Sequence, residues 1–482
     1  MNLFAKKSLE SLVEQTSDKT NGLKRSLGPA NLVALGIGAI IGSGLFVSTA
    51  VAASEYAGPA VIVSYIIGGI GCALAGLCYA EFAAMIPVSG SAYTYAYVTM
   101  GEFVAWIIGW ALVLEYTLGA ATVSIAWSEY LNSLLGGVIP YQWSHSPWET
   151  SSLGTQGIIN LPAIFILFSV SLLLIKGMQE STFVNGLIVI TKVGIVLLFI
   201  IIGWDFINPA NYSPFVIPEG TLGHEVWNHH GWGGVLGGAG IVFFAFIGFD
   251  AVSTTAQETK NPKRDMPIGI LGSLVICTIL FILFSYVLTG IANWQEFKVA
   301  GKEASVVYAI KTYMAGYEWL ATLVTVAILA GFTSVILVML MGQSRIFFAM
   351  SHDGLLPKIF SHIHPTFRTP YKSNILIFLF VAPLSGLIPL NLVTSLTNIG
   401  TLFAFVLVCA GVWIMRIKKP LEHRPFKTPL VPLIPIFGII ICSLLILSLD
   451  GKTHLIAFIW LVLGLVVYFS YSAKHSFINK KP

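Results

Sequence analysis

Long apolar runs separated by short polar linkers dominate this chain. Each run holds about the 20 residues that a helix needs to cross the hydrocarbon core of a bilayer. The runs are continuous, whereas the strands of a membrane barrel alternate apolar and polar residues over about ten positions. Hydrophobic residues make up 56% of the chain and charged residues 10%, against about 25% charged residues in soluble domains. The sequence therefore predicts an all-α integral membrane protein.

Twelve of these runs are long enough to be membrane spans. They cover residues 30–52, 59–84, 101–126, 157–177, 183–204, 233–256, 267–291, 319–345, 372–389, 392–415, 430–449 and 454–472. Because the linkers are short, we expect one membrane domain, 29–473, between an N-terminal tail at 1–28 and a C-terminal tail at 474–482.

The basic residues predict the orientation of the spans. An even number of spans puts both ends of the chain on one side of the membrane. With the N-terminus inside, 21 of the 26 Lys and Arg residues fall in cytoplasmic segments, four fall outside, and Lys192 lies within a span. Because cytoplasmic loops carry an excess of Lys and Arg, we expect cytoplasmic N- and C-termini in a multi-pass protein of the cell membrane.

The first span carries a cluster of glycines at its centre, where Gly42-Ser43-Gly44 lies within 30–52. Glycine costs about 1 kcal/mol against alanine inside a helix. Broken backbone at membrane depth persists only where it is buried in protein or lines a polar cavity. The cluster therefore predicts a helix that opens in mid-membrane to form a binding site, although small residues also serve close helix packing.

A second interruption, Ala245-Phe246-Ile247-Gly248, lies near the middle of the sixth span. Transporters built from inverted repeats place broken helices at corresponding positions of the two halves. The two interrupted spans are five apart. They therefore favour a 5+5 inverted repeat, with halves at about 29–205 and 232–416 and two further helices at about 430–472.

Two broken helices suit a zwitterion. A break frees N–H groups at the start of one half-helix and carbonyl groups at the end of the other. The N–H groups and the positive end of the helix dipole attract a carboxylate, and the carbonyl groups attract an ammonium. No charged side chain lies in 31–52, so backbone groups would bind both the carboxylate and the ammonium. The favoured ligand is therefore an α-amino acid.

Two ionisable residues lie deep within spans. Lys192 is mid-segment in IVITKVGIVLLF, about nine residues from the nearest end of its span, which is roughly 13 Å and long for a snorkelling side chain. An intramembrane charge suggests function, so we interpret Lys192 as a proton carrier. Glu115 lies mid-span in LVLEYTLG and is a candidate proton site, a polar strut or a partner for a cationic substrate. Asp250 is expected to gate or support the second break.

Six segments together resemble the amino acid–polyamine–organocation (APC) superfamily, in particular its cationic amino acid transporter branch with bacterial homologues. They are LGIGAIIGSGLF (35–46), CYAEFAAMIPVSGSAYTYAYVTMGE (78–102), GWALVLEY (109–116), FFAFIGFDAVSTTAQETKNPKRDMPIGI (243–270), GQSRIFFAMSHDGLLP (342–357) and LTNIGTLFAF (396–405). The resemblance spans nearly the whole chain and implies the leucine-transporter-like fold of 12 transmembrane helices, with helices 1 and 6 broken around one central site.

The resemblance also implies roles for individual residues. The substrate carboxylate would meet the backbone N–H groups of Ile40, Ile41, Gly42, Ser43 and Gly44. Phe244, Ala245 and Ile247 would offer carbonyl groups to the amine and apolar surface to the side chain, and Phe244 or Phe246 would act as a gate. Lys192 would occupy the place of the sodium ion in sodium-coupled relatives, so we expect a proton as the coupling ion, no sodium and no other cofactor. Met339 would close the side-chain end of the pocket.

The substrate expected from these residues is a small neutral L-amino acid such as alanine, serine or threonine. Methionine at position 339 would shorten the cavity and supply no polar partner. Cationic amino acids remain the alternative, and a channel is the rival class, although no span shows a repeated polar face. No catalytic motif, metal site or nucleic-acid-binding feature is apparent, so we do not expect an enzyme. The expected partners are the amino acid, the lipid bilayer and, as the superfamily allows, a small accessory membrane subunit.

Overall fold

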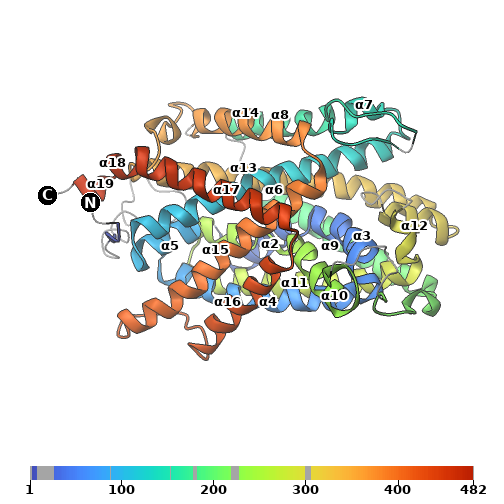
Figure 1. Ribbon diagram of the computed structural model, residues 1–482, viewed down its shortest axis with the longest axis horizontal. Helices are drawn as coiled ribbons and strands as arrows, with labels where there is room; N and C mark the ends of the chain where they lie inside the picture. Colours follow the sequence, from blue (N-terminus) through green and yellow to red (C-terminus); the bar gives the residue numbers. More distant parts are fainter. Residues whose placement is uncertain are drawn as a thin grey trace.

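The structure is a computed structural model that describes residues 3–7, 27–86, 88, 90–151, 153–176, 182–218, 227–298, 305–367 and 369–480. Within these ranges the chain forms helices and no named strand, and the long helices run mostly along the long axis of the molecule (Figure 1). The longer α-helices are α2 (Pro29–Ile40), α4 (Val61–Met85), α5 (Ser91–Thr99), α6 (Glu102–Leu134), α8 (Leu161–Lys176), α9 (Thr182–Gly203), α10 (Gly231–Val242), α11 (Pro262–Ile291), α12 (Ser305–Tyr313), α13 (Glu318–His352), α14 (Tyr371–Leu387), α15 (Leu390–Lys418), α16 (Leu433–Leu447) and α17 (Gly451–Val467). The prediction of an all-α protein is confirmed.

Each expected span coincides with a helix or with an interrupted helix. Eight helical segments of the described chain are long and apolar enough to cross a membrane, and α2, α8, α14 and α16 are apolar but shorter. α2 is short because it is the first half of the interrupted first span. The count of twelve spans, the inverted repeat and the division into tails and domain stay predictions.

The third span is longer than expected. α6 continues to Leu134, eight residues beyond the predicted end at 126. Residues 127–134, WSEYLNSL, are mostly compatible with a helix, so α6 continues until Gly136 and Gly137, which both have positive φ, turn the chain away. A short helix, α7 (Tyr141–Ser144), follows in the connection to α8.

The core of the molecule is built on α6, α13 and α15. α6 packs along both α13 and α15, and α11 packs along α4 and α2. Small residues allow the close approach: a Cβ atom added at Gly36 on α2 would lie 2.6 Å from the Cβ atom of Ser273 on α11. These helices surround the two predicted breaks and hold them in place.

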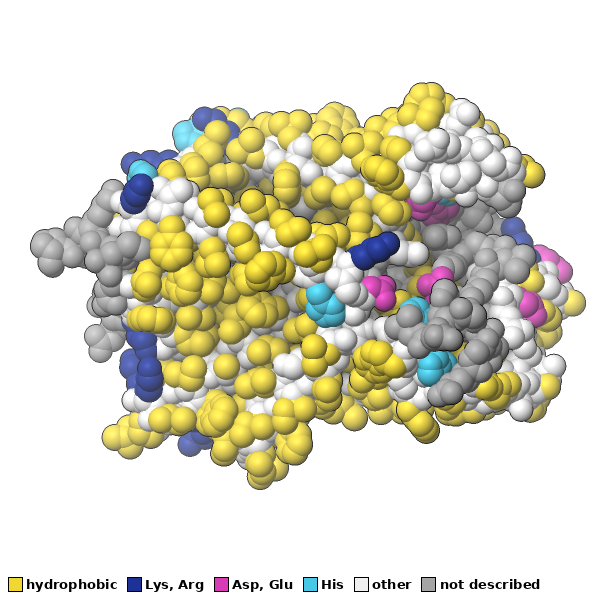
Figure 2. Space-filling model, viewed as in Figure 1, with side chains coloured by type: hydrophobic (Ala, Val, Ile, Leu, Met, Phe, Trp, Pro, Cys, Tyr) yellow, Lys and Arg dark blue, Asp and Glu magenta, His cyan; other side chains and the backbone are white. Residues whose placement is uncertain are grey.

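Basic side chains gather at the end of the molecule where both termini lie (Figures 1 and 2). At this end the Glu81 carboxylate accepts hydrogen bonds from Arg416 at 2.9 Å and lies 3.1 Å from Nε of Arg424. Lys7 pairs with Asp353, and the backbone N–H group of Glu102 donates to the Ala5 carbonyl. The N-terminal residues 3–7 are therefore bound to the helical core, while the side of the membrane they face stays a prediction.

Candidate functional site

The first span is broken at the glycine cluster. α2 ends at Ile40, Ile41 takes an extended conformation with ψ of 96°, and a π-helical segment begins at Gly44. Outside the helices, no hydrogen bond joins the N–H groups of Gly42, Ser43 or Gly44 to another described segment. The first N–H groups of a helix have no partner within it, so these donors are available to a ligand.

The Ser43 side chain lies at the same break. It is 2% exposed, and its hydroxyl has no hydrogen-bond partner among the described residues. A buried polar group without a partner costs about 1–3 kcal/mol. Since the hydroxyl adjoins the free N–H groups, a bound anion would accept hydrogen bonds from the hydroxyl and from these N–H groups.

The sixth span is broken as well. α10 ends at Val242, a 3₁₀ turn covers Phe243–Phe246, and Ile247 is extended before Gly248, whose φ is +113°. The chain then continues as a second 3₁₀ segment, Asp250–Glu258. The N–H group of Ile247 donates to the Phe244 carbonyl at 3.2 Å. A carbonyl oxygen has two lone pairs, so Phe244 retains one for an incoming ammonium.

The two breaks lie against each other. A Cβ atom added at Gly44 would lie 2.6 Å from the backbone nitrogen of Ala245 and 2.8 Å from its Cβ atom. A Cβ atom added at Gly248 would lie 3.0 Å from the carbonyl oxygen of Ala39. Glycine is therefore required at both positions for the backbones to meet, and the breaks form one site.

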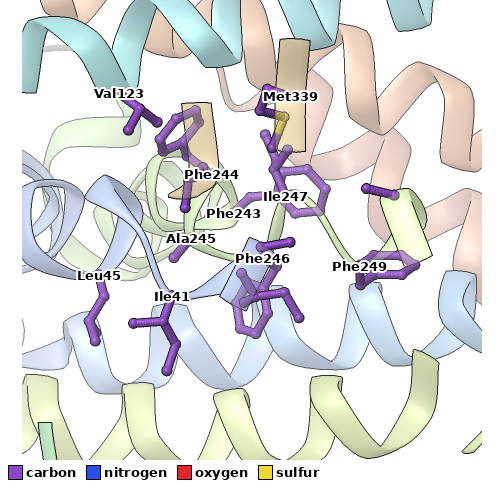
Figure 3. Close-up of a cluster of buried hydrophobic side chains, with 14 of the residues drawn as sticks. Ile41, Leu45, Val123, Phe243, Phe244, Ala245, Phe246, Ile247, Phe249 and Met339 are labelled. Atoms are coloured by element: carbon purple, nitrogen blue, oxygen red, sulfur yellow. The ribbon is translucent and has the colours of Figure 1, made fainter. Parts of the chain in front are cut away.

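Apolar side chains surround this site. Figure 3 shows Phe244, Ala245, Ile247 and Met339 in one cluster of buried side chains, together with Val123 of α6. Each of these residues is less than a tenth exposed. A substrate side chain that entered this cluster would meet hydrocarbon, aromatic rings and a thioether.

Lys192 on α9 is buried beside the first break. Its ammonium donates to the carbonyl oxygens of Gly38 at 2.9 Å and of Ile41 at 3.1 Å, and the residue is 4% exposed. These carbonyls are at the C-terminal end of α2, which carries the negative end of the helix dipole and attracts a cation. The side chain therefore points inward to α2, contrary to the snorkelling alternative.

A Glu115–Asp250 pair lies on the other side of the second break. Both residues are fully buried, and the charges of their carboxyl groups act on each other. The Tyr116 hydroxyl donates to Oδ2 of Asp250 at 2.6 Å. Two buried carboxyl groups at close quarters cannot both be ionised cheaply, so the pair is suited to holding a proton.

Phe246 is placed differently from Phe244. It packs between Tyr65 on α4, with ring centroids 6.2 Å apart, and Phe281 on α11, at 5.3 Å. This position braces the break against two helices, and it favours the supporting role over the gating role. Phe244 points into the apolar cluster instead and is the better placed gate.

Several polar contacts of the site are not apparent from the sequence. The Asn398 amide on α15 donates to the Gly240 carbonyl at 2.8 Å and so caps the end of α10. The Tyr65 hydroxyl lies 2.7 Å from Thr49 Oγ1 and 3.4 Å from the Gly44 carbonyl. In the sequence these residues are visible only as polar residues within apolar spans. That pattern does not show which group each of them contacts.

The geometry is that of a membrane transporter with a central site between two interrupted helices. Residues 27–474 match the model of the amino acid permease family. The chain belongs to the amino acid permease family, within the APC superfamily.

Relatives of known function are similar over most or all of the chain. It is 44% identical to the branched-chain amino acid permease BcaP of Bacillus subtilis (strain 168) over 482 residues, and the aligned region covers 99% of both proteins. It is 42% identical to the methylthioribose transporter of the same organism, over 99% of this chain and all of that one. The vacuolar cationic amino acid transporter 4 of Arabidopsis thaliana is 34% identical over 87% of this chain and 68% of its own length. The family and these relatives are transporters.

Proposed function

We propose that this protein is a proton-coupled secondary transporter that imports neutral L-amino acids across the cell membrane by alternating access. The observation that carries the proposal is the contact between the two helix breaks at Gly44 and Ala245. It brings unpaired N–H groups and the unpartnered Ser43 hydroxyl next to backbone carbonyls of the second break. Donors for a carboxylate and acceptors for an ammonium meet there, as an α-amino acid requires.

The apolar cluster supports an uncharged substrate side chain. Phe244, Ile247 and Met339 offer no partner to a guanidinium or an ammonium, and an unpaired charge is costly to bury. We therefore favour neutral amino acids over arginine and lysine. Alanine, serine and threonine are the small candidates, and the 44% identity to a branched-chain permease favours valine, leucine and isoleucine as the second set.

Lys192 supports coupling to protons. In its charged form the side chain holds the Gly38 and Ile41 carbonyls of α2 through charge-assisted hydrogen bonds, which are about twice as strong as neutral ones. Loss of the proton weakens this hold and lets the first break rearrange. The Glu115–Asp250 pair is a second place where a proton can reside, next to the second break.

An uptake screen in proteoliposomes tests the proposal. Purified protein is given alanine, serine, threonine, leucine, isoleucine, valine, arginine and methylthioribose in turn, with an imposed pH gradient and with or without sodium. We expect accumulation of a neutral amino acid that depends on the pH gradient and not on sodium. Accumulation of arginine or methylthioribose alone would overturn the substrate assignment.

Two further measurements separate the alternatives. Counterflow of labelled substrate is a property of carriers, and its absence would favour a channel. Lys192→Ala should abolish accumulation driven by the pH gradient and leave exchange measurable, whereas unchanged accumulation would refute the coupling role. Co-purification of a small membrane protein from native membranes tests the expected accessory subunit.

A further inference from the structure

The connection between α15 and α16 carries large apolar side chains that the protein leaves uncovered. Leu421 is 98% exposed, Leu430 71% and Ile417 68%. Both helices are apolar, so the connection lies where the chain leaves the bilayer and returns to it. Water is an unfavourable surrounding for these side chains, whereas acyl chains at the edge of the hydrocarbon would bury them. We call the three residues the apolar tips.

The connection is fixed in place by buried polar contacts. Arg424 is 5% exposed, and its guanidinium donates to the carbonyl oxygens of Lys419 and Glu422, both at 2.7 Å. The N–H group of Thr428 donates to the Glu81 carboxylate of α4 at 2.8 Å. These contacts hold the apolar tips and the neighbouring side chains at the surface without the help of a ligand.

Basic side chains lie between the apolar tips. Residues 416–427 contain five Lys or Arg residues and one acidic residue, Glu422. The two arginines bind the buried carboxylate of α4, and the three lysines, Lys418, Lys419 and Lys427, are exposed. Glu422 lies 3.8 Å from Lys419, and an exposed pair of this kind contributes little. The connection therefore presents net positive charge beside exposed apolar side chains.

The N-terminal segment 3–7 adds another ammonium group to this surface. Lys6 is exposed, and its ammonium donates to the Thr99 carbonyl at the end of α5. Partial burial and the charges of Lys418 and Lys419 lower the pKa of Lys6, so these three ammonium groups repel one another. Like charges gathered in one place attract an anion that neutralises them. We call Lys6, Lys418 and Lys419 the lysine triad.

We propose that the lysine triad binds the phosphate of an anionic phospholipid while the apolar tips insert between the acyl chains. Lysines close to a membrane surface attract anionic lipids. The apolar tips favour a lipid over a soluble anion, because a phosphate ion has no apolar part that would cover them. The inference goes beyond the proposed function, since lipid binding requires no substrate.

The bound headgroup would also stabilise the N-terminal segment. The triad joins the connection between α15 and α16 to residues 3–7, whose carbonyl groups at Leu3 and Ala5 accept hydrogen bonds from the first residues of α6. Neutralisation of the triad removes the repulsion that pushes Lys6 away from the connection. Anionic lipid therefore favours the bound position of this segment.

Lipid binding to the purified full-length protein tests the site. The protein in detergent is titrated with phosphatidylglycerol or phosphatidylcholine, and bound lipid is counted by native mass spectrometry. Lys418→Gln/Lys419→Gln should weaken binding of phosphatidylglycerol about tenfold and leave phosphatidylcholine unchanged. Lys263→Gln/Lys358→Gln removes the same charge from two exposed lysines outside the triad and should have little effect. Equal affinity of the wild type for both lipids, or equal loss in both double variants, would overturn the proposal.

Two further variants and a competitor test the parts of the site. Lys6→Gln should weaken binding of phosphatidylglycerol, and Leu421→Ser should weaken it with no change of charge. Inorganic phosphate should leave the lipid bound. Full displacement of the lipid by phosphate would assign the triad to a soluble anion and overturn the lipid site.

Hydrogen exchange tests the effect on the N-terminal segment. Amides of residues 3–7 should be better protected with phosphatidylglycerol than with phosphatidylcholine, and the difference should disappear in Lys418→Gln/Lys419→Gln. Equal protection with the two lipids would refute the link between headgroup and segment. None of these measurements requires transport, so their failure would leave the proposed function standing.

Discussion

Gly44 and Ala245 meet so closely that no side chain fits between them. A Cβ atom at position 44 would lie 2.6 Å from the nitrogen of Ala245, and that neighbour is backbone, which cannot rotate aside. The contact joins the first and sixth spans at the points where both are broken. It explains how backbone groups from two distant segments form one site.

Substitution of Gly44 should therefore abolish transport. Gly44→Val would force the two breaks apart, and we expect uptake to fall to the background of empty proteoliposomes. Gly194→Ala on α9 is the matched control, since a Cβ atom there meets nothing within 4 Å and alanine suits a helix better than glycine. Active Gly44→Val protein would contradict the assigned site.

Gly331 on α13 makes room for Lys192. A Cβ atom at position 331 would lie 2.6 Å from Cε of Lys192. Gly331→Ala should push the ammonium away from the Gly38 and Ile41 carbonyls. We expect loss of accumulation driven by a pH gradient, with counterflow retained, as for Lys192→Ala. Gly331→Ala that still accumulates substrate would show that the position of Lys192 is not critical.

Met339 should limit the size of the substrate. The residue is 2% exposed, and a Cβ atom at Gly119 of α6 would be 3.5 Å from its sulfur. Met339→Ala leaves space in the apolar cluster, so competition by larger neutral amino acids should strengthen relative to alanine. The measurement is inhibition of labelled alanine uptake by leucine and phenylalanine. An unchanged order of competitors would place the side-chain end of the pocket elsewhere.

Glu81 should contribute strongly to stability. Its carboxylate is 1% exposed and is paired with Arg424, which is 5% exposed, and with Arg416. Removal of one partner of a buried ion pair costs about 3–5 kcal/mol. Glu81→Gln should therefore lower the thermal unfolding midpoint in detergent markedly. Glu422→Gln, which breaks the exposed pair with Lys419 at 3.8 Å, should change it little.

The connection after α6 should lose stability as the pH rises. Nε2 of His145 lies 3.1 Å from Oε1 of Glu129. Burial of the ring opposes protonation, but the hydrogen bond to Glu129 and the charges of Glu129 and Glu149 outweigh it and raise the pKa of His145 above 6.5. Because the pKa is higher in the folded state, protonation of His145 stabilises the protein. The stabilisation is complete below about pH 6.5 and disappears as the pH rises through the folded-state pKa.

Hydrogen exchange measures this effect. Amides of residues 141–151 should be less protected at about pH 8.5 than at about pH 6, after correction for intrinsic exchange rates. His145→Gln cannot be protonated, and it should remove the difference. The same difference in His145→Gln would assign the pH dependence to another group.

The sequence by itself determined the helices and the positions of the breaks. Lipid provides no hydrogen bonds to backbone groups, so apolar runs must be helices, and Gly42-Ser43-Gly44 and Ala245–Gly248 were visible as interruptions. Lys192 and Glu115 were visible for a related reason, because a charge within an apolar run is costly. These are local properties, and each can be read from one segment alone.

The tertiary structure decided which groups meet. That Lys192 binds Gly38 and Ile41 beside Gly331, that the charges of Glu115 and Asp250 act on each other, and that Phe246 braces α4 and α11 all depend on contacts between distant segments. Helix periodicity shows that a residue is buried and does not show its neighbour, because an apolar face identifies the side that is covered and not the helix that covers it. Shape and hydrogen bonding in the assembled bundle select the partner.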